Sequence, residues 1–175
     1  MSKANDILLI ADAPQLGAEK TSTASKLFEA QVMSGLLFNC ESWIGITQAQ
    51  IDELQSFQDN FLKKLLHLPV STPKAIMHWD GGMEMIKWRI AKRKLMFVRK
   101  MMKANHDNIC KKAILNEIII GTKGLASECM ELGKELGIRD MRFCKVTKGE
   151  INMAIRNAEH ELQARRDERK HKNRG

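Results

Sequence analysis

The side chains that could do chemistry are scattered along this chain of 175 residues and match no known catalytic pattern. The sequence has no glycine-rich phosphate loop, no dinucleotide-binding glycine pattern and no H-E-x-x-H zinc motif. We interpret His67, His78 and His106 as helix-end or surface histidines. Cys40 lies beside Glu41 with no cationic neighbour in the sequence to activate it, so we interpret it as a small buried residue. We therefore expect no catalytic residues.

The arrangements that could suggest a metal site lack the necessary ligands. The four cysteines are widely spaced, whereas a structural zinc site needs closely paired ligands. The turn at residues 80–82 lacks the further carboxylates of a calcium loop. In the N-terminal stretch LIADA, Asp12 is followed by Ala13, while a two-metal polymerase site needs clustered carboxylates. We expect neither a metal nor a cofactor.

The strongest functional signal is a basic helix expected from about Met83 to Ala104. The net charge of the chain is +8, but residues 1–62 sum to −5, so the remainder carries +13. Trp88 and Phe97 are interleaved with the cations of this helix. Such a helix favours a polyanion, usually nucleic acid, through phosphate contacts that weaken with salt. The same cations could instead keep a long helix soluble while their stems cover apolar surface. The residues alone leave both interpretations open.

Sequence signals in the rest of the chain predict further helices that would position the basic helix. Thr47 and Gln50 form a capping-box pattern at the start of a helix that Pro69 ends. Apolar spacing, caps and glycine stops predict further helices at 24–39, just after Thr72, at 109–120, at 127–136 and from Thr147 onward. We also predict a short strand in DILLIADA (6–13) and an extended stretch at 139–146.

These elements predict an all-α fold, an irregular bundle of about six helices. We divide the chain into a weakly ordered lead-in (1–22), a helical region (23–104) and smaller helices with a charged tail (105–175) that frays beyond Leu162. No segment has the length of a signal peptide core or a membrane span, so we expect an intracellular chain with reduced thiols and no membrane contact. The predicted core comprises Leu37, Trp43, Ile51, Leu54, Phe61, Leu65, Trp79, Ile90 and Phe97.

Three stretches in a fixed order resemble a known region. They are LLFNCESW (36–43), LQSFQDNFLKKLLHLP (54–69) and, after a turn that bears a tryptophan, IKWRIAKRKLMF (86–97). This order is similar to the segment just downstream of the catalytic palm in reverse transcriptases of non-LTR (LINE-like) retrotransposons. The similarity covers about residues 31–102. It continues more weakly through 127–140 and 146–158, which resemble the post-polymerase tail of some of these elements.

The resemblance implies a thumb-and-connector role, in which helices hold a primer–template duplex against the palm. The palm and its paired, metal-binding aspartates are absent from this sequence, so the resemblance implies a truncated, non-catalytic fragment of an RNA-directed DNA polymerase. Its implied partners are an RNA–DNA hybrid or DNA, bound weakly, and the missing palm domain. The alternative is a helical protein–protein interaction module. By position, the phosphate-facing candidates are Lys87, Arg89, Lys92, Arg93, Lys94, Arg99 and Lys100.

Overall fold

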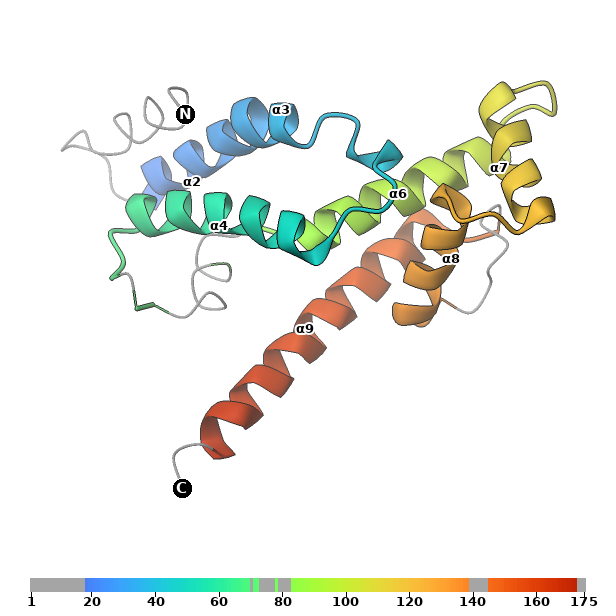
Figure 1. The fold of residues 1–175 in the computed structure, drawn as a ribbon. Helices are drawn as coiled ribbons and strands as arrows, with labels where there is room; N and C mark the ends of the chain where they lie inside the picture. The colour runs from blue at the N-terminus through green and yellow to red at the C-terminus, as the bar shows by residue number, and fades with distance from the viewer. Residues whose placement is uncertain (1–17, 70, 73–77, 79–82, 139–144, 173–175) are drawn as a thin grey trace. The chain divides into compact units, whose positions relative to one another are not determined.

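The protein is described by a computed structural model in which every regular element is a helix (Figure 1). Counting the continuous helical stretch 18–36 once and setting aside a single 3-10 turn at Cys40–Ser42, the described residues form six helices, which confirms the all-α prediction. The predicted strand at 6–13, most of the short helix after Thr72, core residue Trp79 and most of the extended stretch at 139–146 lie outside the described residues. The structure describes residues 18–69, 71–72, 78, 83–138 and 145–172, except the side chains of 18–21, 162–163 and 165–172.

The chain divides into two compact units. Unit 1 comprises Met1–Phe38 and Thr47–Lys87, and unit 2 comprises Asn39–Ile46 and Trp88–Gly175. The basic helix therefore begins in unit 1 and runs on through unit 2. The division predicted from the sequence, into residues 1–22, 23–104 and 105–175, was based on sequence patterns and not on contacts between residues. It stays a prediction.

Unit 1 is organised around aromatic packing between two helical stretches. The first stretch consists of α2 (Ala18–Leu27), a π-helical segment (Phe28–Met33) and α3 (Ser34–Leu36), and the second is α4 (Gln48–Leu65). Phe28 is fully buried and stacks on Phe61 of α4, with ring centroids 3.6 Å apart and planes 11° from parallel. Stacked aromatic pairs add to the stabilisation that comes from burying the rings.

Helix α4 begins with the capping box that the sequence predicts. The hydroxyl of Thr47 accepts a hydrogen bond from the backbone N–H of Gln50, and the Gln50 side chain accepts one from the N–H of Thr47. Two of the backbone donors that a helix start leaves unpaired are thus satisfied. The helix ends at Leu65, and His67 then adopts a left-handed backbone with φ of 50°. The helix thus stops before Pro69, the residue predicted to end it.

Unit 2 contains most of α6 (Ile86–Lys103), followed by α7 (Ile109–Ile120), α8 (Leu125–Glu135) and α9 (Lys148–Lys172). The predicted boundaries of α7 are confirmed: Asn108 caps its start, and Gly121, with φ of 73°, ends it in the left-handed conformation that glycine adopts at little cost. The predicted capping box of Thr147 and Glu150 opens α9.

The predicted core is confirmed in part. Leu37, Phe61, Leu65 and Ile90 are buried. Four further predicted core residues are only half-buried, and the expectation that they would be core residues is corrected accordingly; they are Trp43, Ile51, Leu54 and Phe97.

The start of α8 is capped from a distance by a carboxylate of α7. Oε1 of Glu117 accepts hydrogen bonds from the backbone N–H groups of Ala126 at 2.7 Å and Ser127 at 3.1 Å. A Cβ atom at Gly124 would lie 2.6 Å from the carboxyl carbon of Glu117, so glycine leaves room for this contact. A negative charge at a helix N-terminus is also favoured by the helix dipole. The α7–α8 pair is thereby fixed by one side chain.

We expect Glu117→Ala to lower the free energy of unfolding by about 1–2 kcal/mol, the range for loss of a helix cap. The amides of Ala126 and Ser127 should then exchange hydrogen faster, because they lose their acceptor. Chemical denaturation and hydrogen exchange of the full chain measure both effects. Glu117→Gln keeps an oxygen acceptor and should lose less stability. Equal losses in the two variants would show that capping is not the main role of Glu117.

Candidate nucleic-acid interface

Helix α6 has one buried side and one cationic side. At about 100° per residue, the cations that avoid the buried side fall within an arc of roughly 120° and span about 21 Å along the axis. Of these cations, Arg93, Lys100 and Lys103 are exposed, and Arg89, Lys92 and Arg99 are half-buried. Between Trp88 and Lys103 the sequence contains no acidic residue. We call this set the cationic face of α6: Arg89, Lys92, Arg93, Arg99, Lys100 and Lys103.

Five of the seven sequence-predicted candidates therefore share one face. Lys87 lies in the first turn of α6, in unit 1, and is half-buried. Lys103 was not among the candidates, although its spacing from Arg99 places it on the same face. The remaining candidate, Lys94, has a different environment.

Lys94 is buried, with only 2% of its surface exposed. Its Nζ donates to Oε2 of Glu128 on α8 at 2.5 Å, and the other oxygen of Glu128 accepts a hydrogen bond from the backbone N–H of Gly45. A buried ammonium requires a compensating charge, which Glu128 provides. Lys94 thus joins α6 to α8 and, through Glu128, to the loop before α4. We leave it out of the cationic face.

Two arginines of the cationic face are held in place by neighbouring groups. Arg93 Nη1 lies 3.7 Å from Sγ of Cys40, and Arg99 Nε donates to the carbonyl of Val146 at 2.6 Å. Burial raises the pKa of the Cys40 thiol, and the Arg93 guanidinium partly offsets that effect. Burial also raises the pKa of Cys129 to about 12. Both thiols are therefore protonated at neutral pH and are poor nucleophiles.

The aromatic side chains of α6 contribute to packing. Trp88 is 2% exposed and Phe97 is half-buried. Stacking with nucleic-acid bases needs an exposed ring. The cationic face is thus suited to contact with phosphates.

A buried polar network in unit 1 escaped the sequence analysis. Nε2 of His78 lies 2.8 Å from Oδ1 of Asp59, and its Nδ1 lies 3.1 Å from the carbonyl oxygen of Met83. The Gln55 amide donates to the same Asp59 oxygen and accepts from the backbone N–H of Ile86. Nε2 of His78 thus contacts α4, while its Nδ1 lies at the carbonyl of Met83, just before α6. Asp59 and His78 are 19 residues apart in the sequence, and no sequence signal links them.

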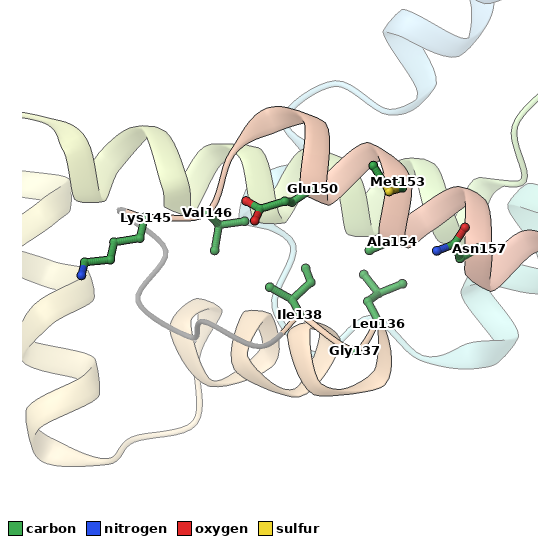
Figure 2. A pocket seen from close by; sticks show the side chains of 9 residues that line it. All are labelled: Leu136, Gly137, Ile138, Lys145, Val146, Glu150, Met153, Ala154 and Asn157. Atoms are coloured by element: carbon green, nitrogen blue, oxygen red, sulfur yellow. The ribbon is translucent and has the colours of Figure 1, made fainter.

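A pocket of about 390 Å³ lies between the end of α8 and the start of α9 (Figure 2). Leu136 and Ile138 extend toward α9, while Lys145 extends away from the other labelled side chains. Glu150, which also lines the pocket, accepts the capping hydrogen bond from the N–H of Thr147. With mostly apolar walls, the pocket offers room for an apolar group, and its described lining residues include no pair of carboxylates for acid–base chemistry.

Two further features are absent from the part of the chain that the structure describes. Within that part, no group of three or more histidine, cysteine, aspartate or glutamate side chains is placed to hold a metal ion. None of the described helices combines the length and apolar character that a membrane-spanning segment needs.

We expect Lys94→Met to lower the free energy of unfolding by about 2–3 kcal/mol, somewhat below the cost of removing one partner of a fully buried pair, because Glu128 is a quarter exposed. Lys100→Met, on the exposed side of the same helix, should change it by less than about 0.5 kcal/mol. Denaturant titration of the full chain compares the two. Similar small losses would contradict a structural role for Lys94.

No family model, no curated protein and no solved structure matches the chain. The interface is therefore defined by the geometry of this chain alone. That geometry consists of a row of cations on one side of α6, with the opposite side anchored by packing and by the Lys94–Glu128 ion pair.

Proposed function

We propose that this chain binds the phosphate backbone of nucleic acid through the cationic face of α6. The observation that carries the proposal is the segregation of charge on this helix. Six cations lie on one side with no acidic residue between Trp88 and Lys103, while off this face Lys94 pairs with Glu128 and Lys87 lies in the first turn, within unit 1. Closely spaced cations on a rigid helix gain favourable energy when a polyanion releases its counterions.

The contacts around the cationic face support a preformed site. Arg93 and Arg99 each make a contact that limits the orientations of their guanidinium groups. Less conformational entropy is then lost when they bind phosphate. Guanidinium groups suit phosphates because their donors match two oxygens at once. With Trp88 buried, we propose binding without sequence preference.

An anionic membrane surface is a weaker candidate for this face. A helix that lies in a membrane interface exposes an apolar stripe beside its cations. In α6 the apolar side chains Trp88, Ile90, Leu95 and Val98 are buried within the protein. The exposed side therefore attracts anions but has little apolar surface to insert.

The resemblance to non-LTR reverse transcriptases suggests a more specific proposal. We propose that the chain corresponds to the region downstream of the palm and contacts a primer–template, either an RNA–DNA hybrid or DNA. In this proposal these residues work inside the cell, carry out no polymerisation themselves, and pack against a palm domain that supplies the metal-binding aspartates. The order of the stretches 36–43, 54–69 and 86–97 supports it.

The alternative proposal is a helical protein–protein interaction module. It is favoured by exposed apolar side chains, among them Phe38 at 77%, Ile44 at 59% and several isoleucines of α7. The two proposals differ in their dependence on salt. Phosphate binding weakens as salt is added, whereas association through apolar surfaces does not.

We expect the triple variant Lys92→Gln, Lys100→Gln and Lys103→Gln to bind a labelled RNA–DNA hybrid at least tenfold more weakly at 0.1 M salt, an order-of-magnitude estimate. The slope of log affinity against log salt concentration should also become shallower by about 2–3, since each phosphate contact contributes roughly 0.9 to its magnitude. Fluorescence anisotropy across a salt series measures both quantities.

The matched control removes three exposed lysines from other helices and loops of unit 2: Lys123, Lys134 and Lys148, each replaced by glutamine. It changes the net charge equally but leaves the cationic face intact. We expect it to retain most of the slope. Equal weakening in both variants would assign the binding to net charge and not to α6. A helical protein that binds no hybrid at low salt would refute the proposal and favour the interaction module.

A further inference from the structure

The outward side of α7 is apolar and exposed. Ile109 and Ile119 are each 80% exposed and Ile120 is 62% exposed, whereas Ile114 is the buried anchor of this helix. Burying an isoleucine side chain is worth about 1.5–3 kcal/mol relative to leaving it in water. Several such side chains together on one helix mark an interaction surface.

The exposed residues follow the spacing of a helix-pairing seam. Ile109, Ala113, Asn116 and Ile120 are separated by four, three and four residues, and all four are exposed. This alternation brings side chains to one stripe of a helix, as in the a and d positions of coiled coils. We call these four residues the α7 seam. Ile119 flanks it.

The seam belongs to a helix that is already fixed. Isolated helices of twelve residues are marginal in water. Here Asn108 caps the start of α7, Gly121 ends it, and Glu117 ties it to α8. A partner of the seam therefore does not have to order the helix before packing against it.

Local charge indicates which partner fits. Residues 105–121 contain two lysines, one aspartate and one glutamate, so this part of a chain of net charge +8 is neutral. Lys112 lies 3.6 Å from Asp107, and Glu117 caps α8. Two copies of a basic chain repel each other. They can approach at α7, because the charges of residues 105–121 sum to zero, whereas two α6 faces would repel each other strongly.

The polar residue of the seam, Asn116, can pair with the same residue of a second copy of the chain. Asn116 offers an amide with both donors and an acceptor, so two such groups can hydrogen-bond to one another. A single asparagine in an otherwise apolar seam selects partners that place another polar group opposite it. A foreign apolar helix would leave the amide unsatisfied, at a cost.

We propose that α7 is a self-association surface, through which two copies of this chain pack their seams in parallel with Asn116 against its own copy. The pairing is isologous, so one patch serves both copies. The inference rests on α7 and does not depend on nucleic-acid binding by α6.

Analytical ultracentrifugation of the full chain, freed of nucleic acid and in about 0.5 M salt to screen repulsion between copies, tests the proposal. We expect a concentration-dependent monomer–dimer equilibrium, which Ile120→Asp weakens at least tenfold. Met153→Asp is the matched control, because Met153 is likewise 62% exposed but lies on α9. A monomer at every concentration up to about 100 µM, a range in which weak specific pairs form, would overturn the proposal. So would equal weakening by both variants.

A cross-linking test does not depend on the behaviour of the aspartate variants. Cys110 is exposed, Cys40 and Cys129 are buried, and Cys144 lies outside the described residues, so replacing both Cys110→Ser and Cys144→Ser leaves only the two buried native thiols. In that background Asn116→Cys should oxidise to a covalent dimer. Lys134→Cys, exposed on α8, is the control and should remain monomeric. Failure of Asn116→Cys to cross-link, or equal cross-linking of the control, would overturn the proposed pairing.

Discussion

The structure of unit 2 depends on how α6 buries one side while carrying eight cations and no acid. A lysine cannot enter an apolar contact uncompensated, because an unpaired ammonium loses its hydration. Lys94 is nevertheless buried, and Glu128 meets it from α8 while also accepting a hydrogen bond from Gly45. One carboxylate therefore connects α6, α8 and the 39–46 loop. Together with the burial of Trp88, Ile90, Leu95 and Val98, this pairing determines which side of α6 faces inward and which cations remain outside.

Local features of the fold could be read from the sequence because they depend on residues three or four positions apart. The capping boxes at Thr47 and Thr147, the Asn108 cap and the Gly121 stop are all of this kind. The amphipathic spacing of α6 likewise indicated that about half of the helix would be buried and that cations would lie on the remaining side. Lys94 was misleading because its residue type suggests a surface position, while its spacing beside Leu95 places it on the buried side.

The features that the sequence did not indicate all arise from long-range contacts. The pair of Asp59 and His78 forms only when the fold brings His78, 19 residues further along the chain, against α4. The burial of Trp88 likewise follows from packing, since tryptophan is equally common at interfaces and in cores. In α7, apolar residues occur around the whole helix, so spacing alone does not show that Ile114 is inside while Ile109 and Ile119 are outside.

The two exposed surfaces of unit 2 follow opposite physical rules. The cationic face of α6 gains energy from counterion release and therefore weakens as salt rises. The seam of α7 is apolar and locally neutral, so added salt screens the repulsion between basic chains and leaves the apolar contact intact. The two activities are thus separable by salt alone. If two copies are joined through α7, each still has its own cationic face, and a nucleic acid long enough to reach both would be bound with a gain from effective concentration.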